Sequence, residues 1–401
     1  MLSGLLSSLT SLSDFLSRGF FIGAFLPTVV FTFVNGLTIY VSSWEFRRWF
    51  NDTFLQAQTA GVTLMLVAGF FAIWIASFVV AALTGWWIKL LEGANWWDWL
   101  RKPGVEYHKV RLAALNCAIE AAVLRYGKIE NQREAWRAAV EEACKAPKPA
   151  NGPDPKVPGL VGKLQETQRR DETIEFAEIE ALQQAFVEDI KLSPGGRDSA
   201  SAVEVLTDYA FRRSLREHGR LETIKRGEFG EVDEIRPTRF GNIGLMAEAH
   251  ALRAYRCNLT LVWAELLRAV EAEDKSSITA INDCKMQLNF FVVLFWSTLV
   301  VASVWSLLFA IHGHSIFALA FALGGPLVAV LFWYEAASEQ YRALQNVIIS
   351  CLNGPARFRL FRDLHLQLPQ DIAAERVLWE KVNFAIMYGR NEELIFKHPS
   401  P

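Results

Sequence analysis

The sequence predicts an all-α integral membrane protein: four transmembrane helices in two hairpins, with a mainly helical cytosolic domain inserted between them. Hydrophobic residues make up 52% of the 401 residues. They gather in four runs, each near or above the roughly 20 residues that cross a bilayer, whereas a mixed polar segment separates the second run from the third. The runs cover about residues 19–42, 60–91, 288–311 and 315–334. This composition excludes an ordinary soluble two-domain enzyme, and a net charge of -2 excludes a globally basic nucleic-acid binder.

The N-terminal segment 1–18 is expected to be a short amphipathic helix at the membrane interface. Its leucines recur at helical spacing among Ser and Thr. Its single basic residue, Arg18, follows the leucines, and the adjoining apolar run is too long for a signal peptide. A frayed apolar tail is the alternative interpretation.

The first apolar run carries a polar stripe, Thr28, Thr32 and Asn35, on one helix face. In an oligomer this face would line a pore; the alternative is hydrogen bonding between neighbouring helices. The cores of the four runs hold no acidic or basic residue except Lys89 near the end of the second, which disfavours an ion-coupled transporter. In the fourth run, residues 324–326 (Gly-Gly-Pro) predict a kink or partial break.

Basic residues predict the orientation. Lys and Arg follow the second and fourth runs, whereas the turn 312–314 between the third and fourth runs has none. The positive-inside rule then places the middle segment and both termini in the cytosol. Arg47 and Arg48, in the first outer turn, oppose this assignment. The five scattered cysteines suggest neither a disulfide framework nor a metal site and fit a reduced cytosolic setting.

The middle segment alternates predicted helices with loops. Apolar periodicity predicts helices over about 105–145, 163–191, 199–226 and 243–273, and five prolines make 146–160 a loop. Beyond the fourth run we expect the helix to continue to Asn353, and a last amphipathic helix over about 370–388. The expected divisions are 1–18, 19–92, 93–286 (the cytosolic domain), 287–335 and 336–401 (the cytosolic C-terminal helices).

Two groups of arginines are candidates for binding an anionic ligand such as a nucleotide or oligonucleotide, because guanidinium pairs bidentately with phosphate. One group, Arg212, Arg213 and Arg216, lies on a predicted helix among glutamates, so a solvated, salt-bridged helix is the alternative. The other, Arg236 and Arg239, lies in the run 236–242 (RPTRFGN). Proline there fixes a turn, Gly241 permits tight backbone, and Asn242 suits a helix cap; a structural brace is the alternative to a ligand site.

Catalytic signatures are missing from the sequence. It contains no P-loop, G-x-G-x-x-G, H-E-x-x-H, G-x-S-x-G or deaminase pattern, and its seven histidines do not cluster. His312 and His314 share a turn, and two solvated turn residues are a simpler interpretation of this pair than a metal site. We therefore expect no catalytic residues, no metal and no cofactor.

The run 237–242 (PTRFGN), together with Ala-Glu at 247, Tyr-Arg at 255 and Val-Trp at 262, resembles a run in uncharacterised bacterial membrane proteins with the same hairpin, cytosolic domain, hairpin order. The order is also similar to that of membrane effectors in bacterial anti-phage defence, in which a cytosolic part senses a signal and the spans open a pore. This resemblance implies a bacterial inner-membrane protein and assigns no residue a role.

The leading hypothesis is an oligomeric membrane channel or pore-forming effector gated by its cytosolic domain. Its partners would be the lipid bilayer, further copies of the chain to form a homo-oligomer, and an anionic ligand at the arginines. The second hypothesis is a non-conducting membrane scaffold that recruits a cytosolic protein partner. A membrane-bound enzyme is the third, and it requires a catalytic set that the sequence does not display.

Overall fold

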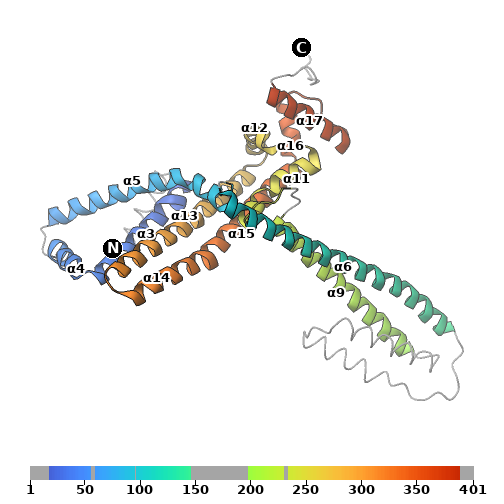
Figure 1. Cartoon of the computed structure of the whole chain (residues 1–401). Coiled ribbons are helices and arrows are strands. Elements are labelled where there is room, and N and C mark those ends of the chain that lie inside the picture. The colour runs from blue at the N-terminus through green and yellow to red at the C-terminus, as the bar shows by residue number, and fades with distance from the viewer. Residues whose placement is uncertain (1–17, 56–58, 95, 146–196, 230–233, 389–401) are drawn as a thin grey trace, which may run out of the picture. The chain divides into compact units, whose positions relative to one another are not determined.

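The computed structural model describes residues 18–55, 59–94, 96–145, 197–229 and 234–388. Those residues are almost entirely helical and contain no strand, so the chain is an all-α membrane protein, as predicted (Figure 1). The expected interfacial helix before Arg18, the proline loop 146–160 and the helix 163–191 lie outside the described residues.

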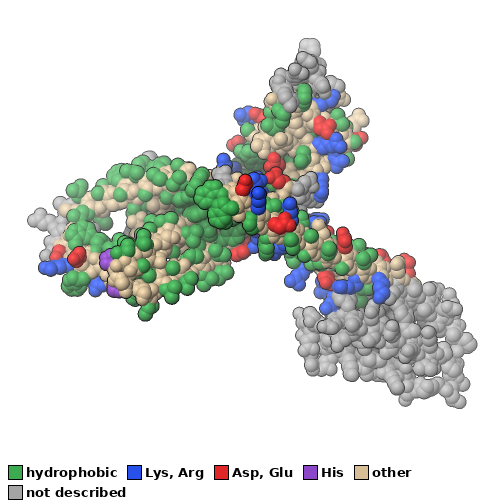
Figure 2. Space-filling model, viewed as in Figure 1, with side chains coloured by type: hydrophobic (Ala, Val, Ile, Leu, Met, Phe, Trp, Pro, Cys, Tyr) green, Lys and Arg blue, Asp and Glu red, His purple; other side chains and the backbone are tan. Residues whose placement is uncertain are grey.

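Four helical stretches are long and apolar enough to cross a membrane: Phe21–Ser42, Gly61–Leu91, Lys275–Ile311 and Ser315–Asn353. They match the four predicted runs, except that the third begins earlier and the fourth ends later than predicted. The surface of their apolar runs is largely hydrophobic, whereas Lys, Arg, Asp and Glu gather elsewhere on the molecule (Figure 2). This distribution is the one a lipid environment requires.

The first span consists of a π-helical turn, η1 (Phe21–Phe25), and α3 (Leu26–Ser42); the second is α5 (Thr59–Leu91). Between them lie α4 (Trp44–Phe50), capped by the Ser43 hydroxyl, and η2 (Asn51–Leu55). The third span, α13 (Lys275–Ile311), packs against α3, α5 and η1 and lies along the fourth span. It is therefore the central helix of the four.

The fourth span continues through its Gly-Gly-Pro sequence without a break, and a π-helical stretch follows the proline. The helix α14 (Ser315–Val328) contains Pro326 and passes directly into the π-helix η3 (Ala329–Tyr334) and then α15 (Glu335–Asn353). Proline removes one backbone donor, and a π-turn is one way to absorb the mismatch within a continuous helix. Gly325 has a second role: a Cβ there would lie 2.1 Å from Ala302 Cβ, so glycine allows α14 to approach α13 closely.

The chain forms two compact units, residues 1–109 with 227–401 and residues 110–226. The expected cytosolic domain 93–286 is thus divided, because its later part packs on helices that follow the fourth span. These contacts join α11 (Met246–Tyr255) and α12 (Leu259–Glu273) to α15, α16 (Ala356–Asp363) and α17 (Ile372–Tyr388). The helix expected over 243–273 is two helices, since Arg256 adopts a left-handed φ of 58° and ends α11.

A core of aromatic and aliphatic side chains forms where α12, α16 and α17 pack together beside the start of α13. Trp379 is fully buried against Phe361, their ring centroids 4.7 Å apart, with Leu266 and Ile281 buried in the same cluster. Beside it, the buried carboxylate of Glu375 accepts a hydrogen bond from Arg357 at 2.8 Å. The same guanidinium also binds carbonyls at the end of α15.

The second unit is a helical hairpin. It comprises most of α6 (Asp98–Lys145) and α9 (Arg197–Phe229). The two helices meet where Arg125 pairs with Glu217 at 2.9 Å and Tyr126 lies 5.1 Å from Phe211. Buried and half-buried side chains on α6 recur at alternate spacings of three and four residues, as in a coiled-coil seam: Leu112, Leu115, Ile119, Ala122, Tyr126 and Ile129.

Candidate functional site

The most elaborate polar arrangement in the first unit surrounds the loop that carries the RPTRFGN run. This loop leads into α10 (Arg239–Gly244), which packs against the end of α5 and against α15. We call the arrangement the junction and define it by Glu92, Arg236, Thr238, Asn242 and Tyr341. It joins the end of the second span to the helix that continues the fourth.

Glu92 is the centre of the junction. One carboxylate oxygen accepts a hydrogen bond from Arg236 Nη1 at 2.8 Å, and the other accepts from the Tyr341 hydroxyl at 2.6 Å. The side chains of Glu92 and Arg236 are 13% and 27% exposed. Because a carboxylate taken out of water needs a partner for its charge, Glu92 requires both the loop and α15 to be in place.

The loop is held by its own side chains. Thr238 caps α10 by accepting from the Gly241 amide at 2.9 Å, and its hydroxyl donates to the Leu91 carbonyl at 2.7 Å. Asn242, expected to suit a helix cap, instead closes the loop on itself: its Oδ1 accepts from the Arg236 amide, and its Nδ2 donates to the Arg236 carbonyl. Thr238 takes the cap because it alone stands at the position before the first helical turn.

Glycines allow the segments of the junction to touch. A Cβ on Gly241 would lie 2.2 Å from the Glu92 carbonyl oxygen, and one on Gly104 would lie 2.6 Å from the Pro237 carbonyl oxygen. Gly93 combines a φ of +73° with a similar conflict at Pro237 Cγ. A side chain at any of these positions would push the loop away from α5 or α6.

Arg239 pairs with α15 at the surface of the same site. Its Nη1 lies 2.8 Å from Glu335 Oε2, and its Nη2 lies 3.5 Å from Glu339 Oε1. Tyr334 accepts a hydrogen bond from the Phe240 amide at 3.2 Å. Both arginines of the predicted anion site therefore contact carboxylates of the chain itself. Their arrangement matches the alternative interpretation, a structural brace.

The other arginine candidates lie in the hairpin. Arg212 and Arg216 are exposed and Arg213 is half-buried on α9. Arg216 Nε donates to the Arg212 carbonyl at 3.4 Å, and the neighbouring Glu217 is paired with Arg125. The two predicted groups of arginines belong to different compact units.

The polar stripe of the first span is engaged by helix contacts along much of its length. Thr28 is buried and donates to the Ala24 carbonyl at 2.7 Å, and Thr32 is exposed and donates to the Thr28 carbonyl at 2.8 Å. Asn35 bridges two spans: its amide donates to Phe31, and its Oδ1 accepts from Trp305 Nε1 at 2.9 Å. Thr32 is thus the member of the stripe whose side chain is exposed in a single copy.

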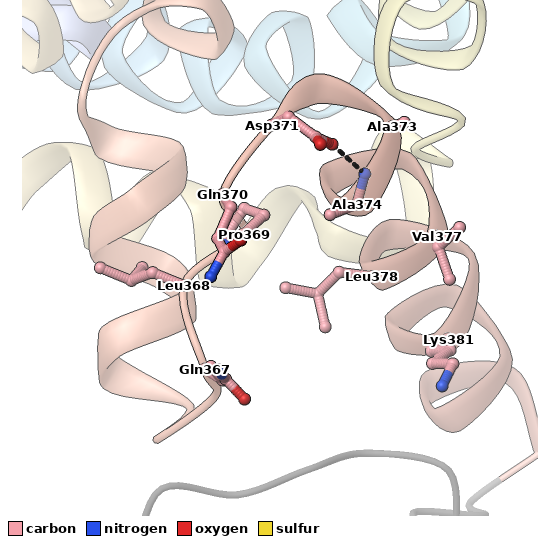
Figure 3. Close-up of a pocket in the computed structure, with 10 residues that line it drawn as sticks. All are labelled: Gln367, Leu368, Pro369, Gln370, Asp371, Ala373, Ala374, Val377, Leu378 and Lys381. Atoms are coloured by element: carbon pink, nitrogen blue, oxygen red, sulfur yellow. Dashed lines mark hydrogen bonds between the residues drawn. The ribbon is translucent and has the colours of Figure 1, made fainter.

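A pocket with a volume of about 550 Å³ lies beside α17. Leu368, Val377 and Leu378 supply apolar wall, and Asp371 accepts a hydrogen bond from the Ala374 amide at 2.7 Å, so its carboxylate serves as a helix cap (Figure 3). Within the described ranges, His, Cys, Asp and Glu side chains form no group of three that could hold a metal ion.

Comparisons with known proteins identify no relative. Protein-family models, curated proteins and solved structures all fail to match the chain.

Sequence reasoning identified the loop of the junction but missed two of its members. Glu92 follows an apolar run, where an acidic residue is typical of the membrane interface and does not indicate a site. Tyr341 lies in a helix of mixed composition, which gives no signal of its own. Glu92 is the first acidic residue after the 31-residue second span. That position, together with an arginine-bearing Pro-Gly loop elsewhere in the chain, is the signal from which a pair could have been proposed.

Proposed function

We propose that the chain is a membrane channel or pore-forming effector, assembled from several copies, whose state is set by the helical hairpin α6–α9. One observation carries the proposal: the junction binds the end of the second span and the extension of the fourth, and both hairpin helices connect to it. Glu92 lies just before α6 in the chain, Arg236 lies just after α9, and Gly104 near the start of α6 packs on Pro237. A displacement of this loop or of the start of α6 would therefore act on the ends of two spans.

The orientation is part of the proposal. With the middle segment and both termini in the cytosol, the junction and hairpin would lie on the cytosolic side, where a signal from the cell interior can act. An inner membrane of a bacterium fits both this arrangement and the resemblance to anti-phage effectors. An anionic ligand such as a nucleotide would then act at the hairpin arginines, because those of the junction are occupied by carboxylates.

Several copies are needed because four spans are too few to enclose a wide aqueous path. The first span offers the polar wall for such a path, with Thr32 as the exposed member of its stripe and Asn35 beside it. The third span, central within one copy, is in a poor position to face a shared axis.

Ion flux in liposomes tests the proposal. The purified protein would be reconstituted, and flux compared between the wild type, Thr32→Val and Asn35→Leu. We expect Thr32→Val to reduce flux severalfold and Asn35→Leu to abolish it. Thr63→Val is the matched control, because it makes the same change at an exposed position of the second span, and it should leave flux unchanged.

Arg236→Met provides a second arm for a protein that is closed at rest. Loosening the junction should change the flux of the reconstituted protein in either direction, whereas a variant of an exposed pair, Arg268→Met, should not. Equal flux in the wild type, Thr32→Val and Asn35→Leu would remove the first span from the pore wall. Absence of flux in every variant would reject the channel.

A non-conducting scaffold is the second candidate. The hydrogen bond from Trp305 to Asn35 and the burial of Thr28 favour it, since they use the polar stripe for packing between helices. The pocket beside α17 would then be a site for a cytosolic protein partner. No flux, together with unchanged assembly of Asn35→Leu, would support this candidate.

A further inference from the structure

The helix α6 carries a second apolar stripe besides the one that faces α9. Its members follow each other at alternating spacings of four and three residues, and all are exposed: Val110, Ala114, Cys117, Ala121 and Leu124. Val110 is 63% exposed and Leu124 is 75% exposed. A helix needs only one such stripe to pack on one neighbour, so packing of α6 on α9 does not require the second stripe.

This spacing is the signature of a coiled-coil seam. Side chains that repeat every three and four residues stay on one face of a helix and interlock with the same pattern on a partner. Alanine at alternate positions lets two helices approach closely. The stripe contains no polar residue from Val110 to Leu124, although a solvent-facing helix surface is ordinarily polar.

We propose that the exposed stripe of α6 pairs with the same stripe of α6 in a second copy of the chain, the two helices running parallel. The proposal rests on the proposed function in one respect, that several copies assemble in the membrane. It names the surface through which the hairpins of two copies would meet.

The charges beside the stripe select a second copy and a parallel pair. In a parallel coiled coil, a flanking residue of one helix meets the residue five positions later on its partner. Glu120 and Arg125 flank the stripe at this spacing and would attract each other across the pair. The same spacing occurs earlier in the sequence, at Glu106 and Arg111. In an antiparallel pair centred on Cys117, Glu120 would instead lie opposite Ala114 and Arg125 opposite Lys109, so the attraction is lost and two positive charges come together.

Arg125 already donates to Glu217 of its own hairpin at 2.9 Å. This contact is compatible with the pairing because a guanidinium has five donor hydrogens and can bind two carboxylates. Its side chain is 39% exposed and that of Glu217 is 42% exposed, so the group remains accessible to a neighbour.

The stripe is short, about 21 Å at a rise of 1.5 Å per residue. A pair of this length is weak between free molecules, and tethering of both partners in one membrane raises their effective concentration. We therefore expect pairing in membranes at ordinary expression levels rather than between isolated hairpins.

Cysteine cross-linking of the full-length protein in membranes tests the proposal. In a parallel pair Cys117 faces Cys117 of the second copy within the reach of a disulfide. In a background with Cys144→Ser and Cys284→Ser, mild oxidation should join two copies through Cys117. The matched control moves the thiol to an exposed position off the stripe, Cys117→Ser with Val123→Cys, and should give about fivefold less product.

Because Cys117 lies at the middle of the stripe, it would also meet itself in an antiparallel pair. Cys117→Ser with Leu124→Cys removes this ambiguity, since two thiols at 124 meet only when the helices are parallel. Leu124→Glu, with Cys117 retained, should reduce the Cys117 product to the level of the control by placing two carboxylates in the seam.

Equal product from the Cys117 and Val123→Cys proteins, or none from Leu124→Cys, would overturn the parallel interface. The liposome experiment is a separate readout. Cross-linking without flux would reject the channel and keep the interface, whereas flux without cross-linking would reject the interface and keep the channel.

Discussion

Removing the positive charge of Arg236 should destabilise the protein by leaving Glu92 without its cationic partner. In Arg236→Met the side chain keeps its approximate length, and the backbone amide that binds Asn242 is unchanged. The substitution therefore isolates the ion pair from the rest of the loop.

The magnitude follows from the burial of the pair. Removing one partner of a fully buried ion pair costs about 3–5 kcal/mol. Glu92 is 13% exposed and Arg236 is 27% exposed, so solvent screens the remaining charge in part. The Tyr341 hydroxyl also continues to donate to Glu92. We therefore expect a loss of about 2–3 kcal/mol in the free energy of unfolding.

Unfolding in mixed micelles, followed by tryptophan fluorescence, measures this change. The control is Arg268→Met, whose side chain is 74% exposed and pairs with Glu265 within one helix, and which should cost no more than about 0.5 kcal/mol. The double variant Arg236→Met with Glu92→Gln should recover part of the loss, because the unpaired charge is removed. Equal losses for Arg236→Met and Arg268→Met, or additive losses in the double variant, would refute the reasoning.

Two further predictions use the same unfolding measurement. Gly241→Ala places a Cβ 2.2 Å from the Glu92 carbonyl oxygen and should lower the free energy of unfolding by about 3 kcal/mol. Gly127→Ala lies in α6, where a Cβ would have no neighbour within 4 Å, and should raise the free energy of unfolding by about 0.5–1 kcal/mol. Similar effects from both substitutions would contradict the packing. Asp274 caps α13, and hydrogen bonds from Ser276 and Ser277 lower its pKa from 3.8 to about 2. A carboxyl group whose pKa is lowered by folding stabilises the protein above its unfolded pKa, so the stability gap between the wild type and Asp274→Ala should shrink as the pH falls from about 4 to about 2; a gap that stays constant would show that the charge does not contribute.

The sequence predicts the parts of this fold that depend on local composition. The apolar runs mark the spans because lipid demands uninterrupted hydrophobicity, and the end of α15 at Asn353 follows from the Gly354-Pro355 pair. The division of the middle segment was not predictable in this way. Whether α12 packs on α16 or on the hairpin depends on surfaces that lie far apart in the chain.

The candidate site shows the same limit. Pro237 and Gly241 predict a rigid loop, because the backbone conformation that each residue favours is known without knowing what the loop contacts. Arg236 and Arg239 were ambiguous between a ligand site and a brace, since a guanidinium binds phosphate and carboxylate with the same geometry. The carboxylates that contact them, Glu92 and Glu335, lie about a hundred or more residues away in the chain, so the sequence alone could not pair them.

The junction and the hairpin differ in how they are held. The junction combines ion pairs, a helix cap and glycines that permit contact at backbone distance, so a small displacement there breaks several interactions at once. The hairpin seam consists of aliphatic and aromatic side chains, Tyr126 and Phe211 among them, and the second stripe of α6 is exposed. The junction would therefore pass a displacement from one of its segments to the others, whereas the exposed stripe of α6 would bind another copy of the chain. Under the proposed function, the cross-linking experiment detects pairing of the hairpins, and the Arg236→Met flux experiment detects the effect of the junction on the spans.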